Sequence, residues 1–354
     1  STGEILCMVS SHTYDPRMMV GRQRGVNNNL LSRNQHKPLL NRAIMGQYPP
    51  GSTFKTTQAL TFLQEGIITP QTLFPCSMGF RFRGLTVGCH AHGAPIPLVP
   101  SLATSCNSYY CWGLFQMFSN RQKYGTVQDA MTRWKDYMVS MGFGYTLGVD
   151  LPGEKRGMIP NAPYYDKAYR GSWNGLTVIS ISIGQGEVNA TPLQIANLGA
   201  TIANRGWFIT PHVVKDIQDE ELDSLYTKRR YTMASPSNYE YVVEGMRQAV
   251  LAGTCRGANS PLYEVCGKTG TAQNPHGQDH SAFMGFAPMD DPKIAICVYV
   301  ENGIWGATFG VPIGALMMEQ YLTGGLSPES EEKAKTFEER HLIQFDDGFI
   351  KQEK

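Results

Sequence analysis

The sequence contains no apolar run approaching the ~20 residues that a helix needs to cross a lipid bilayer. It also begins without an initiator methionine and without a signal peptide. We therefore expect these 354 residues to be a portion of a longer protein. Hydrophobic residues make up 42% of the chain and charged residues 17%, a composition typical of a folded protein with a large buried core.

An excess of charge of either sign is also missing, because 31 basic residues are balanced by 30 acidic ones. The formal net charge of +1 offers no basic stripe for nucleic acid and no broad acidic surface. Nucleic acid is therefore not an expected partner, and we find no internal repeat at a fixed period. Partners have to be inferred from the chemistry of a candidate site.

The stretch from Tyr48 to Lys55 leads a rigid Pro-Pro-Gly turn into a serine that opens an amphipathic helix. Ser52 and Lys55 are one helical turn apart, so the lysine amine can reach the serine hydroxyl. The helix N-terminus also favours negative charge on an attacking oxygen. Ser52 is a candidate nucleophile with Lys55 as its base, although a lone S-x-x-K pattern more often marks an N-cap serine followed by a solvated lysine.

Two later motifs change how the first is interpreted. Residues Ser105–Asn107 fit S-x-N, and residues Lys268–Thr271 fit K-T-G-T. The three motifs follow the order found in penicillin-binding proteins and β-lactamases. The chain resembles the serine acyl-transferases that recognise penicillin, and more narrowly the transpeptidase domain of class B penicillin-binding proteins of the penicillin-binding protein 2 kind.

This resemblance implies an α/β (α+β) fold of the penicillin-binding protein and serine β-lactamase type, with a central antiparallel sheet flanked by helices. It covers most of residues 1–325, which we expect to form the transpeptidase domain. Residues 326–354 are expected to form a charged tail that is extended or loosely held. The N-terminal membrane anchor and pedestal of the family would lie outside this sequence.

Local patterns predict the main elements independently. Residues Ile5–Val9 read as a buried strand, and Thr191 with Gln194 forms a capping box that opens a helix. Consecutive strands are expected at 268–272, 281–288 and 293–301. Further helices are expected at 107–118, 128–141, 238–252 and 311–322.

The resemblance also assigns catalytic roles. Neutral Lys55 would take the proton from Ser52 as the serine attacks a carbonyl, which requires a lowered lysine pKa. Lys268 would supply part of the positive charge that lowers it. Ser105 would relay a proton to the leaving group, and Asn107 would hold the acyl-donor peptide through its amide.

The third motif is expected to bind substrate along a strand edge, with Thr269 and Gly270 as binding residues and Thr271 as a catalytic one. The resemblance places the oxyanion hole at the backbone amides of Ser52 and Thr271. Strict strand alternation separates Lys268 and Gly270 from the two threonines. All four can serve one ligand only if the strand edge twists or the threonine hydroxyls reach around it.

The implied reaction is acylation of Ser52 by the terminal D-Ala-D-Ala of a peptidoglycan stem peptide, followed by transfer to an amino group of a neighbouring stem. β-Lactam antibiotics would mimic the donor and stall the acyl-enzyme. The implied partners are a membrane glycosyltransferase and cell-elongation proteins. The implied location is the periplasmic side of the inner membrane, to which the missing N-terminal anchor would hold the domain.

Two alternatives stay open. A β-lactamase of class A needs a deacylating glutamate, but no Glu between Ser105 and Lys268 has Asn four residues later. A non-catalytic penicillin-sensing receptor domain would be acylated only to signal. Several membrane spans before the domain would favour the receptor, whereas a single anchor would favour the transpeptidase.

Four residues form a candidate zinc site, because Cys76, Cys89, His92 and Cys106 follow the spacing C-x12-C-x2-H-x13-C. Three thiolates and an imidazole suit a closed, tetrahedral structural zinc site, and His90 is the substitute ligand if His92 points away. A disulfide between Cys76 and Cys89, with Cys106 as a buried thiol, is the alternative.

The resemblance supports the metal. Some members of the penicillin-binding protein 2 family hold zinc beside the active site through Asp, His and Cys, and here Cys would replace the Asp ligands. Because Cys106 lies between Ser105 and Asn107, zinc would fasten the preceding loop to the second catalytic motif.

Overall fold

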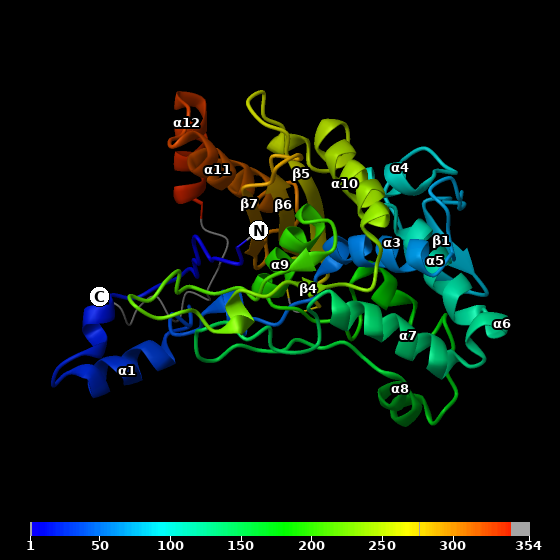
Figure 1. Cartoon of the computed structure of the whole chain (residues 1–354), viewed down its shortest axis with the longest axis horizontal. Coiled ribbons are helices and arrows are strands. Elements are labelled where there is room, and N and C mark those ends of the chain that lie inside the picture. The colour runs from blue at the N-terminus through cyan, green and yellow to red at the C-terminus, as the bar shows by residue number, and fades with distance from the viewer. Residues whose placement is uncertain (1, 276, 341–354) are drawn as a thin grey trace.

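The computed structural model describes residues 2–275 and 277–340. Its centre is an antiparallel sheet of β5 (Cys266–Ala272), β6 (His280–Ala287) and β7 (Ile294–Val300), in that order (Figure 1). Thr269 pairs with Phe283, and Phe283 pairs with Val298. The predicted strands are confirmed, and so is the predicted fold of helices around a central antiparallel sheet.

Helices make up most of the remaining regular secondary structure in the described residues. Those before the sheet are α1 (Arg24–Arg33), α2 (Arg42–Met45), α3 (Lys55–Gln64), α4 (Leu98–Ala103), α5 (Asn107–Ser119), α6 (Arg121–Tyr124), α7 (Val127–Ser140), α8 (Ala162–Tyr169), α9 (Pro192–Ala203) and α10 (Pro236–Leu251). Those after it are α11 (Gly310–Thr323) and α12 (Pro328–Glu338). Within the described ranges, no helix has both the length and the apolar character that a membrane span requires.

Shorter elements connect these helices. Two small hairpins pair β1 (Gly79–Phe82) with β2 (Leu85–Gly88) and β3 (Trp207–Phe208) with β4 (Arg230–Tyr231). The 3-10 turns are η1 (Pro16–Met19), η2 (Gly51–Phe54), η3 (Ile179–Ile183), η4 (Ser224–Tyr226) and η5 (Arg256–Ala258). The predicted capping box is confirmed at the start of α9, where Thr191 and Gln194 exchange side-chain to backbone hydrogen bonds.

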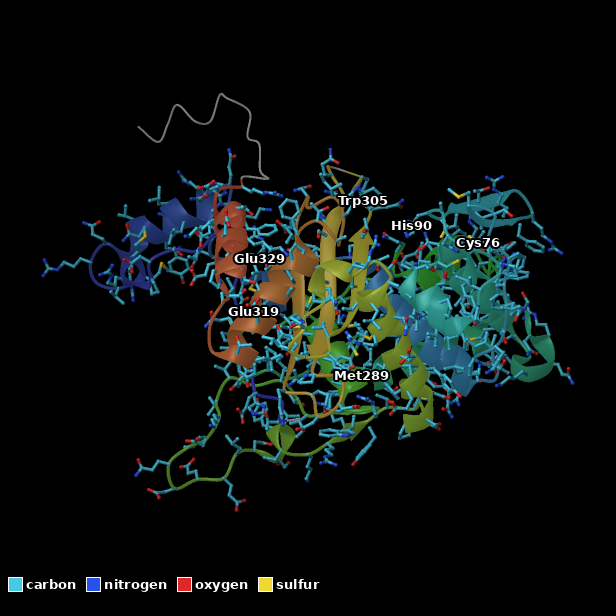
Figure 2. The ribbon with its side chains drawn as sticks, turned by 90° about the horizontal axis from the view of Figure 1, so that it is seen from above. Cys76, His90, Met289, Trp305, Glu319 and Glu329 are labelled. Atoms are coloured by element: carbon cyan, nitrogen blue, oxygen red, sulfur yellow. The ribbon has the colours of Figure 1, made fainter. Side chains whose placement is uncertain are left out.

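Helices α9 and α11 cover opposite faces of the sheet. A Cβ added at Gly199 of α9 would lie 3.2 Å from Met284, and one added at Gly314 of α11 would lie 2.5 Å from the Phe283 ring. Consecutive strand residues point to opposite faces, so Met284 and Phe283 belong to two separate hydrophobic cores. Figure 2 shows the two layers, with Glu319 of α11 on one side of the sheet and the larger helical region on the other.

Two predictions about the ends of the chain are wrong. Residues 5–9 do not form a buried strand, because Glu4 makes a single bridge to His212 and the Val9 side chain beyond it is 71% exposed. The expected extended tail is helical over Pro328–Glu338. Its Phe337 ring packs against Phe309 with centroids 5.9 Å apart, and this contact docks α12 on the domain. The remainder of the expected tail, from residue 341, lies outside the described residues.

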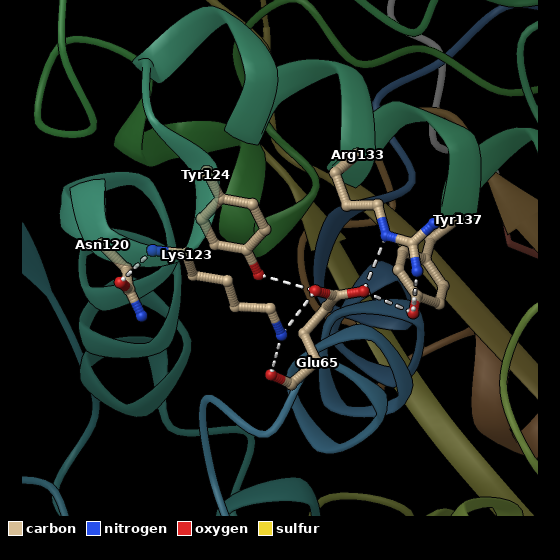
Figure 3. Close-up of polar contacts among 6 residues, drawn as sticks. All are labelled: Glu65, Asn120, Lys123, Tyr124, Arg133 and Tyr137. Carbon is tan, nitrogen blue, oxygen red and sulfur yellow. Dashed lines mark hydrogen bonds and ion pairs between the residues drawn. The ribbon is translucent and has the colours of Figure 1, made fainter.

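A buried carboxylate fixes the far end of α3. Glu65 accepts hydrogen bonds from Tyr124 (2.8 Å), Arg133 (2.8 Å) and Tyr137 (2.7 Å) and forms an ion pair with Lys123 at 2.8 Å (Figure 3). Burial favours the neutral acid, but these donors outweigh it and lower the pKa of Glu65 to about 2. The ionised carboxylate therefore ties α3 to α6 and α7.

Candidate active site

The candidate nucleophile lies in a turn that glycine makes possible. Gly51 has a φ of +56°, and its N–H donates to Gly184 O at 3.0 Å. A Cβ added at Gly51 would lie 2.7 Å from Thr271 O, so only glycine lets the turn approach β5 this closely. Ser52 follows in η2, and the α3 helix continues from Lys55. The expected helix from Ser52 to Gln64 is thus confirmed, with a 3-10 first turn.

Lys55 connects the first motif to the second. Its side chain is fully buried, and its Nζ donates to Ser105 O (2.6 Å), Ser105 Oγ (3.1 Å) and Asn107 Oδ1 (2.6 Å). Burial lowers the pKa of Lys55 to about 8, so about a tenth of the amine is neutral at pH 7, far more than for a solvated lysine. Within the described residues, these bonds hold the amine towards the second motif instead of the Ser52 hydroxyl.

Ser105 lies between two buried amines. Lys268 Nζ donates to Ser105 Oγ at 2.8 Å, on the same oxygen that Lys55 contacts. Burial, reinforced by the charge of Lys55, lowers the pKa of Lys268 to about 7. Ser105 also has a left-handed backbone with φ of +57°, a conformation that costs energy for a residue other than glycine. This hydroxyl is therefore placed to pass a proton between an amine and a bound substrate.

The third motif forms the edge strand of the sheet. A Cβ added at Gly270 would lie 2.9 Å from Pro50 O, so the strand also packs directly against the nucleophile turn. Thr269 Oγ1 donates to Thr254 Oγ1 at 2.8 Å, and Thr271 O accepts from Gln185 Nε2 at 3.2 Å. Lys268 points to Ser105 while the backbone of Thr271 faces the turn, so the strand contributes to the site through both side chains and backbone.

The four predicted metal ligands converge. The candidate ligand atoms of Cys76, Cys89, His92 and Cys106 all lie within 4.8 Å of one another, and Cys89 Sγ is 3.4 Å from His92 Nε2. Two of these residues flank the β1–β2 hairpin, and Cys106 is the N-cap of α5. His90 is not a member of this cluster. All eight cysteines of the chain are free thiols in the structure.

The surroundings of this cluster suit zinc. His92 Nδ1 lies 2.7 Å from Gly93 O, an arrangement that leaves Nε2 free to bind a metal. The hydrogen bond with Cys106 lowers the pKa of the Cys89 thiol, and the Asn107 N–H at 3.3 Å adds to the effect. The hydrogen bond with Cys89 raises the pKa of Cys106, and burial raises that of Cys76. The fit to a closed sulfur and nitrogen site therefore rests on the donor types and their convergence.

Sequence reasoning missed several residues that support the nucleophile turn. Tyr48 donates to Glu301 Oε1 at 2.6 Å and stacks on Tyr299 with ring centroids 4.4 Å apart. Tyr299 in turn donates to Pro49 O at 3.2 Å. Gln185 belongs to an Ile-Gly-Gln-Gly stretch. Its two glycines could have indicated that the backbone here packs closely against another segment.

Together, the fold and the three assembled motifs are those of the penicillin-recognising class of serine proteins. The family model described as "Penicillin binding protein transpeptidase domain" matches residues 1–318. The chain therefore belongs to the penicillin-binding protein transpeptidase family, and its similarities to individual members place it in class B.

Three similar proteins illustrate the relationship. Peptidoglycan D,D-transpeptidase MrdA of Acinetobacter baumannii is 33% identical over 338 residues, which cover 87% of this chain and 47% of that protein. The crystal structure of Pseudomonas aeruginosa PBP2 in complex with WCK 5153 has a TM-score of 0.80 at 30% identity, covering 93% of this chain and 71% of that one. PBP2 of Helicobacter pylori in complex with MreC has a TM-score of 0.74 at 25% identity, covering 89% and 57%. The chain spans about half the length of the curated MrdA relatives it matches.

Proposed function

We propose that this chain carries the acyl-transfer site of a peptidoglycan D,D-transpeptidase that acts in cell elongation. The observation that carries the proposal is the buried hydrogen-bond network in which Ser105 Oγ contacts both Lys55 and Lys268. Two lysines with lowered pKa values share the hydroxyl of Ser105, and Lys55 lies one helical turn from Ser52, so the cluster is suited to proton transfer at neutral pH. Relatives named as D,D-transpeptidases support the same reaction.

In the first half of the reaction, neutral Lys55 takes the hydroxyl proton while Ser52 Oγ forms a bond to the carbonyl carbon of the penultimate D-Ala. The carbonyl π electrons move to oxygen, where the amides of Ser52 and Thr271 stabilise the charge. Collapse of this intermediate breaks the C–N bond. The departing D-Ala amine receives a proton through Ser105, which regains one from a neighbouring lysine.

In the second half, an amino group of a neighbouring stem attacks the Ser52 ester. Its extra proton passes to the base, the bond between carbon and Ser52 Oγ breaks, and the hydroxyl is protonated again. A β-lactam follows only the first half, because its leaving nitrogen stays attached to the acyl group and blocks the acceptor. The strand edge at Thr269 and Gly270 would pair with the extended donor peptide, and Asn107 would hold it through its amide.

We also propose a structural zinc ion held by Cys76, Cys89, His92 and Cys106. When bound, zinc would supply a rigid cross-link with no redox chemistry of its own. Asn107 donates its backbone N–H to Cys89 Sγ and its side-chain amide to Gly88 O at 2.7 Å. The hairpin that Cys76 and Cys89 flank is therefore bonded directly to the proposed substrate-binding residue Asn107.

The wider biological role is proposed by similarity. The stem peptides of peptidoglycan would be the substrate and β-lactams the inhibitors. A membrane glycosyltransferase and cell-elongation proteins would be the partners. The complex of Helicobacter pylori PBP2 with MreC supports the binding of a protein partner by such a domain. The domain would work on the periplasmic side of the inner membrane, held there by an anchor outside this sequence.

Covalent labelling tests the proposal. A labelled penicillin should attach to Ser52, and Ser52→Ala should abolish the adduct. Mapping of the adduct to another residue by mass spectrometry would contradict the assigned nucleophile. Release of the label within seconds would contradict a stalled acyl-enzyme and would instead favour a β-lactamase.

A further inference from the structure

Three segments that are distant in sequence meet at Thr271, at the end of the third motif. The nucleophile turn approaches from one segment, since a Cβ at Gly51 would lie 2.7 Å from Thr271 O. The loop after η3 approaches from another, and Gln185 Nε2 donates to that same oxygen at 3.2 Å. Strand β5, which contains Thr271, is the third.

The loop that carries Gln185 is rigidly placed. Gln185 N–H donates to Ser180 O at 3.1 Å, which closes the loop onto η3. Gly184 has a φ of +70°, and a Cβ there would lie only 2.2 Å from Gly51 O. The Gln185 side chain thus projects from a backbone that is locked against the nucleophile turn, and its amide reaches Thr271 from a fixed position.

The backbone of Thr271 faces this turn with both of its polar groups. A Cβ at Gly51 would lie 2.7 Å from Thr271 O and 3.2 Å from Thr271 N. In an antiparallel pair, the N–H and C=O of one residue point to the same side of the strand. Because Gln185 binds the carbonyl from outside the sheet, the Thr271 N–H also points away from its partner Ser281 and towards the turn.

We infer that Gln185 is a positioning residue for the oxyanion hole. Its amide fixes the carbonyl of Thr271 and thereby aims the N–H of the same residue at the oxygen of the acyl group on Ser52. This inference rests on the proposed acyl-enzyme at Ser52, and it adds a residue to which that mechanism gives no role. Without the Gln185 amide, the edge strand loses a hydrogen bond on the side that faces the nucleophile turn. The Thr271 N–H is then less well aligned with the acyl oxygen.

The test compares acylation by penicillin G in the wild-type chain, Gln185→Leu and Gln185→Glu. Both variants lose the donor at similar side-chain volume. The first-order acylation rate constant should fall on the order of tenfold, less than the hundredfold typical of deleting an oxyanion donor. The dissociation constant of the non-covalent complex should stay within twofold, because the hole is occupied by charge only in the transition state.

A second measurement distinguishes alignment from a general structural effect. Infrared difference spectra with a ¹³C label at the reacting carbonyl report the hydrogen bonds to that oxygen in the acyl-enzyme. The carbonyl band should move to higher wavenumber in both variants. Gln248→Leu is the matched control, since its amide donates to Glu244 on α10, and its rate and band should equal those of the wild type.

Unchanged rate and band position in both Gln185 variants, with the wild type acylated at Ser52, would overturn the role of Gln185 alone. A wild-type chain that penicillin G does not acylate at Ser52 would overturn the proposed function as well. If Gln185→Leu does not fold, the rate and carbonyl band of Gln185→Glu decide the outcome.

Discussion

Lys268 Nζ lies 2.8 Å from Ser105 Oγ, although 163 positions separate the two residues in the sequence. The contact joins the edge strand of the sheet to the turn before α5, so the second and third motifs meet through one hydrogen bond. Because Lys55 contacts the same hydroxyl at 3.1 Å, a single serine connects all three motifs. A change of protonation at one of these three side chains therefore alters the proton affinity of the other two.

The role of Lys55 as the base predicts a specific loss. Lys55→Ala should slow acylation of Ser52 by about 10²–10⁴-fold, which is the contribution typical of a general base. Stopped-flow measurement with a fluorescent penicillin gives the rate. Lys167→Ala, at an exposed position of α8, serves as the control and should acylate normally. Near-normal acylation in Lys55→Ala would show that another group accepts the proton.

The lowered lysine pKa predicts how acylation depends on pH. Burial lowers the pKa of Lys55 to about 8, and the base acts only when neutral. The acylation rate should therefore rise with pH, with a midpoint near 8, and fall as the amine is protonated at lower pH. Lys55→Ala should lose this rise. A rate that stays flat from about pH 6 to 9 would exclude this lysine as the titrating base.

The candidate catalytic residues could be listed from the sequence because the chemistry restricts which residue types can stand in each motif, and the structure brings Lys55, Ser105 and Lys268 together. The relative positions of the three motifs could not be predicted, because they depend on the packing of segments that are distant in the sequence. Tyr48 and Glu301 form a 2.6 Å hydrogen bond across 253 positions, and nothing local in either segment indicates the contact. The lowered pKa of Lys268 likewise follows from burial that only the fold creates.

The two wrong predictions have different causes. The Ile5–Val9 run has high β-propensity, but propensity alone supplies no neighbouring strand, and the segment stays on the surface. The start of α12, by contrast, could have been predicted from the sequence. Ser327 caps the helix and Pro328 occupies its first position, a standard pair of start signals that the high charge of the tail obscured.

The proposed zinc site predicts a metal content and its loss. Purified protein should hold about one zinc per chain, and His92→Ala should lose it while His90→Ala keeps it. Cys7→Ser is a matched control for Cys89→Ser, because Cys7 is exposed and outside the cluster. Removal of the metal by a chelator should lower the unfolding temperature and slow acylation, because Asn107 is bonded to Cys89 and Gly88.

Elemental analysis with peptide mapping decides between the metal and a disulfide. Less than about half a zinc per chain, together with a crosslinked peptide joining Cys76 to Cys89, would show that these thiols form a disulfide. Reduction before the measurement then restores free thiols but adds no metal. The expected result is instead that the three thiols of Cys76, Cys89 and Cys106 are fully alkylated only after chelation.

The Glu65 network predicts how stability depends on pH. The pKa of Glu65 falls from 4.5 to about 2 on folding, so ionised Glu65 stabilises the fold fully above pH 4.5. That stabilisation disappears as the pH falls towards 2, when the carboxylate is protonated in the folded state. Glu65→Gln should lower the free energy of unfolding at pH 7 by about 2–3 kcal/mol and should reduce this loss in acid.

Urea denaturation at pH 3, 5 and 7 measures both effects. Glu221→Gln, at an exposed loop position, should match the wild type at each pH because its carboxylate is solvated in the folded and unfolded chain. The difference in stability between the wild type and Glu65→Gln should narrow at pH 3, because Glu65 is then mostly protonated in the unfolded chain and folding must release that proton. Parallel stability curves across this range would show that Glu65 is not the group that makes folding sensitive to acid. In that case Lys123 and Arg133 would stabilise the end of α3 through packing of their side chains rather than through charge.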